Sequence, residues 1–301
     1  MKTISTILCA TDFGACAQAA LMQSLRIANA HGARVDLLHV ANVPHYVRRD
    51  MVGVLGPSGA RPLSEIAVEE CAREMEVTVE GLPEQDRQRV TTHCKFGAPV
   101  ATILQFAEAH RADLIVIGSS GKTRVTKYIL GGTAGKVVRG ATCPVLCVPN
   151  DEARATRKVL VASDFSDCAR RALEAGAFMA QAAHAHLEVA HVTPSAWSLP
   201  PGVNVGFTGQ TANWLELLER EAREQLDEFV DKARIDGIKV DSRALLVGSP
   251  AQSLLSHARD HEFDLLVLGT HGRSGVARLM LGSVAETVVH HAPAPVLTVR
   301  G

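Results

Sequence analysis

The sequence lacks an excess of charge of either sign, since 31 Lys and Arg residues stand against 32 Asp and Glu residues for a formal net charge of −1. Such a balance creates no strong field for nucleic acid or for an anionic membrane surface. The sequence also lacks any apolar run near the roughly 20 residues that a membrane-spanning helix needs. Its first residues, MKTISTILCATDFG, predict a β-strand rather than a secretory signal peptide. We therefore expect a cytoplasmic protein with no nucleic-acid or membrane partner.

A framework of paired cysteines is also missing. Cys143 and Cys147 are four residues apart, which on a strand separates them by about 13 Å, too far for a disulfide or a shared zinc ion. The cysteines without any C-x-x-C partner are Cys9, Cys16, Cys71, Cys94 and Cys168. All are therefore predicted to be reduced thiols that pack as small apolar groups.

Histidine is abundant, at 13 residues, but its spacing does not specify a metal site. His257 and His261 are four residues apart on a helical pattern and can share a metal. The other close pairs are His184 with His186 and His290 with His291. Since no third ligand accompanies any pair, we expect no metal site and predict that these histidines lie on the surface.

What the sequence does contain is an internal repeat over nearly its whole length. The segment DLIVIGSSGKTRVTKYILGGTAGKVVRGATCPVLCV from Asp113 is matched by DLLVLGTHGRSGVARLMLGSVAETVVHHAPAPVLTV from Asp264, 151 residues later and without a gap. Upstream, ILCATDF in the first copy corresponds to VLVASDF in the second, and GAPVATIL corresponds to GSPAQSLL. This order and spacing indicate a duplicated domain. We expect domains at 1–149 and 157–301, joined by a short polar linker.

Each copy alternates predicted strands with predicted helices. Residues 114–117 and 265–268 are apolar throughout, which is typical of strands buried on both faces of a parallel sheet. Residues 169–183 and 214–233 place apolar side chains at helical spacing. The pattern predicts an α/β protein with two tandem doubly wound, Rossmann-like, five-stranded parallel-sheet domains. The Gly- and Pro-rich stretches 42–62 and 193–211 are predicted to be long loops.

A glycine pattern follows a predicted strand in the second copy. It reads Gly269, two residues, Gly272, nine residues, then Gly282 and Ser283, where a helix is expected to begin. Glycines let a backbone approach phosphate oxygens, and a helix N-terminus supplies unpaired N–H groups with a partial positive charge. Ser283 can cap the helix or donate its hydroxyl to a phosphate. A tight strand-to-helix turn without a ligand explains the same glycines, and that alternative stays open.

Other phosphate-binding and catalytic signatures are missing from the sequence. GSSGKT at Gly118 is not a P-loop, because Val116 stands five residues before Gly121, where that motif needs a glycine. No G-x-G-x-x-G follows either first strand, and neither an H-x-G-H adenylylation signature nor a nucleophile–base pair is recognisable. We therefore do not expect an efficient enzyme.

On these residues the sequence resembles the universal stress protein family, whose hallmark is Gly, two residues, Gly, nine residues, Gly, then Ser or Thr. The second copy has every element, and VLVASDFSDCARRALEAG looks like the family's first strand, acidic residue and helix. Because the resemblance covers both copies, the chain is similar to tandem members of that family. It implies a doubly wound α/β fold and, as in ATP-binding members, adenosine held between the ends of the first, second and fourth strands. The implied ligand is ATP or another adenine nucleotide, with Mg²⁺ as a candidate companion ion.

Carried over by position, the resemblance implies a nucleotide site in the second copy. Asp164 would accept from a sugar hydroxyl or a base amine, and its alternative role is to cap the helix near Ser166. Arg273 can pair with a phosphate or be a solvated loop cation. The residues implied for adenine, ribose and phosphates are Ala162, Asp164, Val192, Leu268, Gly269, Gly272, Arg273, Gly282, Ser283 and Val284.

The first copy departs from the family motif where its final Ser or Thr should stand. Gly132 is the equivalent of Ser283, Thr133 follows one residue late, and Gly14 replaces the equivalent of Ser166. A weaker second site is therefore expected. Its residues are Asp12, Val40, Gly118, Gly121, Gly131, Gly132 and Thr133.

The function that the resemblance implies is stress response, by a protein that senses or sequesters an adenine nucleotide and acts as a regulator. The alternative is a scaffold or interaction module with a vestigial nucleotide fold, since some family members bind no ATP. The last strands, expected at 145–148 and 296–299, are apolar, and family members commonly dimerise through them. We expect the two copies to pair through these strands, and a homodimer of whole chains stays open.

Overall fold

The structure, a computed structural model, describes residues 3–41, 52–54, 60–120, 130–149, 154–193, 210–233, 239–272 and 281–301. The chain divides into two compact units. The main parts of one unit are Thr3–Lys127 and Gly131–Ala153, and the main part of the other is Arg154–Gly301. Each unit therefore holds one copy of the sequence repeat.

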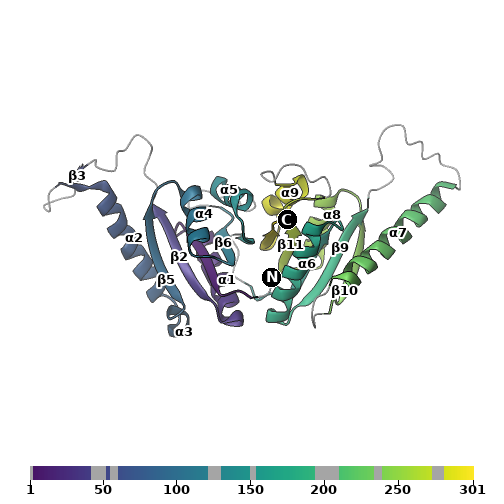
Figure 1. The fold of residues 1–301 in the computed structure, drawn as a ribbon, viewed down its shortest axis with the longest axis horizontal. Helices are drawn as coiled ribbons and strands as arrows, with labels where there is room; N and C mark the ends of the chain where they lie inside the picture. The colour runs from purple at the N-terminus through teal and green to yellow at the C-terminus, as the bar shows by residue number, and fades with distance from the viewer. Residues whose placement is uncertain are drawn as a thin grey trace. The chain divides into compact units, whose positions relative to one another are not determined.

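The first unit is built on a parallel sheet with the strand order β5-β2-β1-β6-β7, of which Figure 1 labels β5, β2 and β6. Its strands are β1 (Thr6–Thr11), β2 (Arg34–Ala41), β5 (Val90–Phe96), β6 (Leu114–Gly118) and β7 (Val145–Val148). Its helices are α1 (Ala15–His31), α2 (Leu63–Glu80), α3 (Glu84–Arg87), α4 (Pro99–Ala109) and α5 (Gly132–Gly140). This is the doubly wound α/β arrangement that the sequence predicted.

Two short strands interrupt the long loop predicted at 42–62. β3 (Val52–Val54) and β4 (Ala60–Pro62) pair antiparallel, with Gly53 opposite Arg61. The prediction of a loop is therefore wrong for these residues, while 42–51 and 55–59 lie outside the described part of the chain. Gly and Pro were the signals for a loop, but Pro62 is tolerated because it ends its strand.

The second unit repeats the parallel sheet with the order β10-β9-β8-β11-β12. Its strands are β8 (Lys158–Ser163), β9 (His186–Thr193), β10 (Ser242–Val247), β11 (Leu265–Gly269) and β12 (Val296–Val299). Its helices are α6 (Asp167–Ala183), α7 (Gln210–Lys232), α8 (Pro250–Asp260) and α9 (Ser283–His291). In the part of the chain that is described, no helix is both long enough and apolar enough to span a bilayer.

The buried strands and helix faces follow the sequence pattern. Leu114, Ile115 and Val116 of β6 are fully buried, as expected for a strand covered on both faces. In α6 the buried stripe includes the predicted Leu173 and Gly176. A Cβ on Gly176 would come within 2.5 Å of a methyl group of β8, so glycine there lets the helix pack closely on the sheet.

In each unit helices cover both faces of the sheet. Helices α1 and α2 follow the two strands that lead outward from β1 to β5, whereas α4 and α5 belong to the connections that lead back toward β7. Right-handed crossovers place these two helix pairs on opposite faces. The strand order therefore reverses between β1 and β6, and between β8 and β11 in the second unit. Open α/β sheets bind ligands at such a point, beside the carboxyl ends of the strands.

A disulfide joins Cys71 of α2 to Cys94 of β5. The expectation of reduced, unpaired thiols is therefore wrong for these two residues. Helix α2 packs along the outer strand β5, and this tertiary contact brings together two cysteines that are 23 residues apart in sequence. Cys143 and Cys147 are free, as their spacing predicted, and the other free cysteines are Cys9, Cys16 and Cys168.

Candidate functional site

A cavity of about 290 Å³ opens in the second unit, where the sheet order reverses. It lies between the carboxyl ends of β8, β9 and β11 and the beginning of α9. The predicted site residues that line it are Ala162, Asp164, Val192, Leu268, Gly269, Gly272, Gly282, Ser283 and Val284. The remaining predicted residue, Arg273, lies outside the described residues. The structure thus gathers residues from four separate segments around one cavity.

The first unit has a cavity of the same volume, about 290 Å³, at the equivalent place. The residues predicted for the weaker site that line it are Asp12, Val40, Gly118, Gly131, Gly132 and Thr133. Gly121 lies outside the described residues. Thr133 faces this cavity even though it comes one residue later than the family motif requires.

The acidic residue after the first strand of each unit shapes a tight turn into the next helix. Asp164 Oδ1 accepts a hydrogen bond from the Ser166 amide at 3.1 Å, and Phe165 between them has a φ of 65°. Ser166 itself caps α6, because its hydroxyl oxygen accepts from the Ala169 amide. The capping role considered for Asp164 therefore belongs to Ser166, while Asp164 supports the turn and also lines the cavity.

The first unit forms the same turn without the cap. Asp12 Oδ1 accepts from the Gly14 amide at 3.0 Å, and Phe13 has a φ of 61°. Gly14 precedes α1 and supplies no side-chain cap. The turn geometry is therefore retained in both copies, whereas the helix cap differs between them.

A histidine at the end of the second strand of each unit also lines the cavity, and the sequence analysis assigned it no role. In the second unit His191 Nδ1 lies 2.8 Å from the Ser163 carbonyl oxygen, and its ring stacks on Phe165. Because a carbonyl oxygen only accepts, Nδ1 donates this hydrogen bond. His39 repeats this arrangement in the first unit. The signal was the shared His-Val pair in LLHV and EVAHV.

The beginning of α9 presents backbone donors to the cavity. Glu286 donates the first intrahelical hydrogen bond, to the Gly282 carbonyl, so the amides of residues 283–285 have no acceptor within the helix. Gly282 is the N-cap residue, and no side-chain cap bond is present. Ser283 is exposed at the first helical position. Of its two predicted roles, capping is therefore not observed.

Comparison with known proteins agrees with this geometry. The sequence model described as the universal stress protein family matches residues 3–149 and again residues 155–300. The chain belongs to the universal stress protein family. A universal stress protein of Mycobacterium tuberculosis is 30% identical over 227 residues, which are 70% of this chain and 69% of the relative. Another, from Mycolicibacterium smegmatis, is 28% identical over 305 residues, or 98% and 96% of the two chains.

Solved structures show the same fold along the whole chain. A functionally unknown protein from Pseudomonas aeruginosa PAO1 superposes with a TM-score of 0.65 at 23% identity, covering 99% of this chain and 92% of the other. A universal stress protein from Archaeoglobus fulgidus gives a TM-score of 0.63 at 21% identity, with 98% of each chain covered. These two structures support the tandem arrangement of universal stress protein folds.

The glycines of the universal stress protein motif have two different structural roles here. A Cβ on Gly269 would lie 2.6 Å from Cys168 Sγ in α6, so this glycine lets the helix approach the strand. A Cβ on Gly272 would lie 2.8 Å from Asp164 Oδ2, so this glycine leaves room beside the carboxylate. Part of the motif therefore serves the strand-to-helix packing that was the alternative explanation, and part shapes the cavity.

The remaining wall of the second cavity comes from residues that the motif does not include. Pro250 and Leu254 of α8 supply an apolar side, and Thr270 and His271 follow β11. The Thr270 hydroxyl and His271 Nδ1 lie 2.8 Å apart, while His271 Nε2 is buried without a hydrogen-bond partner among the described residues. The cavity is thus lined by apolar and by polar side chains.

Proposed function

We propose that the second unit binds ATP or a related adenine nucleotide and that the chain acts as a stress-response sensor or regulator in the cytoplasm. The observation that carries the proposal is the cavity at the sheet reversal, which combines Asp164 with the free amides at the beginning of α9. Ligands of open α/β sheets bind at this place. Helix N-termini bind phosphate there through unpaired N–H groups and the helix dipole.

Each part of a nucleotide finds suitable chemistry in the cavity. Ala162 and Val192 offer apolar surface to a base, and Asp164 offers a carboxylate to sugar hydroxyls. Gly272 and Ser283 offer a close backbone approach and a hydroxyl to phosphate oxygens. A volume of about 290 Å³ is at the lower end of the range for small-molecule sites. Mg²⁺ would enter with the phosphates, because it binds proteins mainly through phosphate oxygens and one or two carboxylates.

A regulatory role is part of the proposal, and it is supported by how the fold holds the ionisable lining groups. Asp164 supports its turn, the His191 ring is fixed on the Ser163 carbonyl, and His271 is paired with a neighbouring hydroxyl. These hydrogen bonds orient the groups for binding.

The paired arrangement of the two copies is also part of the proposal. β7 and β12 each end the strand order of their own unit, and both consist mainly of apolar residues. Apolar end strands are prone to pair with another strand. We infer that these two strands associate, and a solved structure in which they are far apart would contradict this inference.

The test of nucleotide binding uses protein as purified and a matched pair of variants. Heating should release an ultraviolet-absorbing ligand that chromatography identifies as an adenine nucleotide. Added ATP should raise the melting temperature, since a ligand at a hundred times its Kd stabilises by about 2.7 kcal/mol. Gly272→Val, whose side chain meets Asp164, should abolish the shift, whereas Gly121→Val in the first copy should leave it. A clean apo protein whose melting does not respond to ATP supports the scaffold function instead.

A further inference from the structure

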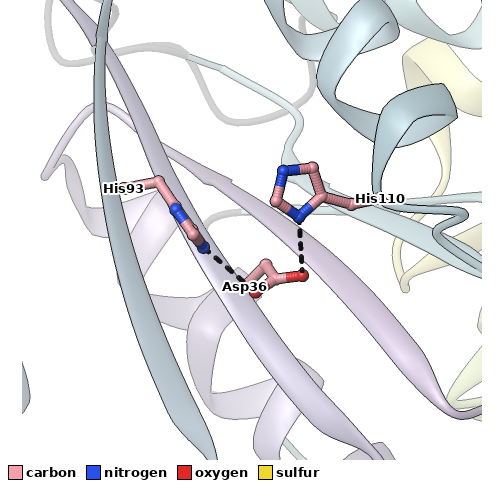
Figure 2. A group of neighbouring side chains, drawn as sticks. All are labelled: Asp36, His93 and His110. Carbon is pink, nitrogen blue, oxygen red and sulfur yellow. Dashed lines mark hydrogen bonds and ion pairs between the residues drawn. The ribbon is translucent and has the colours of Figure 1, made fainter.

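A carboxylate and two imidazoles meet in the first unit, on the face of the sheet that α4 covers (Figure 2). Asp36 comes from β2, His93 from β5, and His110 directly follows the last residue of α4. Asp36 Oδ1 lies 3.0 Å from His93 Nε2, and Asp36 Oδ2 lies 3.8 Å from His110 Nδ1. One ligand atom from each residue falls within 4.8 Å of the others. None of the three residues lines the cavity of this unit.

The carboxylate is buried and one of its oxygens lacks a hydrogen bond. Asp36 is 4% exposed, and its Oδ2 has no hydrogen-bond partner among the described residues. Its contacts at ion-pair range are His110 Nδ1 and Arg34 Nε, both at 3.8 Å. A buried carboxylate oxygen without a hydrogen bond is costly, and a coordinated cation removes that cost. The Arg34 side chain is 58% exposed, so it can move aside when a cation enters.

Ring packing holds both imidazoles close to the carboxylate. Phe106 of α4 stacks on His110 with ring centroids 3.7 Å apart, and the His93 ring packs against Phe106 at 4.8 Å. The two histidine side chains keep 20% and 38% of their surface exposed. The two imidazoles are therefore restrained by the fold and in contact with solvent, while the carboxylate itself is buried.

We propose that Asp36, His93 and His110 bind a zinc ion. Zinc takes His nitrogen and carboxylate oxygen in tetrahedral geometry at about 2.1 Å, which places ligand atoms about 3.4 Å apart. The observed separations are 3.0 Å from His93 Nε2 to Oδ1 and 3.8 Å from His110 Nδ1 to Oδ2, and one ligand atom from each residue lies within 4.8 Å of the others, so small side-chain shifts bring the three ligands to that spacing. Three protein ligands leave the fourth position to water. Magnesium and calcium prefer sites made of oxygen alone, so two imidazoles favour zinc over them.

The second unit has part of this arrangement and serves as an internal comparison. Glu188 holds in β9 the register position that Asp36 holds in β2. Both of its oxygens are already bonded, because Ser242 Oγ donates to Oε2 at 2.6 Å and His257 Nε2 bonds Oε1. Ala244 stands at the register position of the strand histidine. The second unit therefore lacks both the unsatisfied oxygen and the third ligand.

The cluster contains none of the close histidine pairs that the sequence drew attention to. His257 is bonded to Glu188 with a side chain that is 13% exposed, so its prediction as a surface residue is wrong. His261 directly follows the last residue of α8, as His110 follows α4. This position makes His261 a matched control for a test of the zinc site.

The experiment uses the full chain, stripped with a chelator and titrated with Zn²⁺ against a competing chelator, and separately with Co²⁺. The wild type should bind one zinc ion tightly, and cobalt should give visible d–d bands without thiolate charge-transfer absorption. His93→Gln and His110→Gln should each weaken zinc binding by at least about tenfold, whereas His261→Gln should not. Since His110 lies at a surface helix end, circular dichroism of that variant should match the wild type.

Two results overturn the zinc proposal. One is the absence of a tight site, either because the wild type takes up no zinc or because both cluster variants bind zinc as tightly as the wild type. Asp36 and the two histidines would then be an ion-paired cluster only. The other is a thiolate band in the cobalt spectrum, which would assign the metal to cysteines. No nucleotide is added in these titrations, and the three proposed ligands lie outside the cavity of their unit, so the outcome of the variants is distinguishable from that of the nucleotide-binding proposal.

Discussion

Moving one hydroxyl between the two copies should change nucleotide affinity in both. Ser283→Ala removes the hydroxyl at the first residue of α9, and Gly132→Ser adds one at the first residue of α5. Ser283 is exposed and makes no cap bond, and a Cβ on Gly132 meets nothing within 4 Å. Neither substitution should therefore disturb the fold, so a change in affinity reports on the ligand contact itself.

The size of the effect follows from the contact that is lost. A hydrogen bond to a charged acceptor contributes about 1.5–3 kcal/mol. Since about 1.4 kcal/mol is a factor of ten, Ser283→Ala should raise the Kd for ATP by roughly 10- to 150-fold. Gly132→Ser should strengthen the first site by up to the same factor. The helix amides that accompany the hydroxyl are already in place in both units.

Isothermal titration with a non-hydrolysable ATP analogue measures both sites, and Gly132→Ala is the control that adds a Cβ without a hydroxyl. The double variant Ser283→Ala with Gly132→Ser should bind more tightly in the first unit than in the second. If Ser283→Ala leaves affinity and stoichiometry untouched while Gly121→Val abolishes binding, the stronger site has been assigned to the wrong copy.

Three further predictions concern stability. Replacing both Cys71 and Cys94 by Ser opens a loop whose ends are 23 residues apart, and this should lower the free energy of unfolding in urea by about 3 kcal/mol. A double variant with the same urea midpoint as the wild type would contradict this prediction. Burial raises the pKa of Cys147 from 9.0 to about 12. The contribution of the protonated thiol to the free energy of unfolding is therefore complete below pH 9 and is lost as the pH rises to 12. At pH 10 the loss is about 1.4 kcal/mol, and Cys147→Ala should reduce the alkaline fall in unfolding free energy. Leu146→Lys or Leu297→Lys places a charge at a fully buried position and should cost at least about 3 kcal/mol by the same assay; a loss below 1 kcal/mol would refute it.

The parts of the fold that sequence alone could predict are those that depend on local pattern. β6 and β11 are continuous apolar runs because parallel strands are buried on both faces. The buried stripe of α6 follows helical periodicity. The duplication strengthened each of these inferences, because the same pattern occurs twice. The residues of the candidate site were found in the same way, since Gly269, Gly272 and Gly282 keep fixed distances along the chain.

The parts that sequence could not predict depend on contacts between distant elements. Cys71 and Cys94 have no diagnostic spacing and meet because α2 packs on β5. Asp36 lies 57 residues from His93, and no local pattern connects them. His191 was visible as part of a strand, but its role depends on the Ser163 carbonyl and the Phe165 ring beside it. In each case the deciding interaction lies across elements, where periodicity carries no information.

The two copies show which features of a duplicated domain are set by the backbone and which by side chains. The turn after the first strand, with Asp12 or Asp164 bonded two residues ahead, is the same in both. The place of the cavity is also the same, because it follows from the strand order, and both cavities have a volume of about 290 Å³. The copies differ at single side chains, since Ser283 stands where the first copy has Gly132, and Ala244 stands where the first copy has His93. Because such exchanges leave the strands and turns intact, each copy can take its own ligand, which is what we propose for nucleotide in the second copy and for zinc in the first.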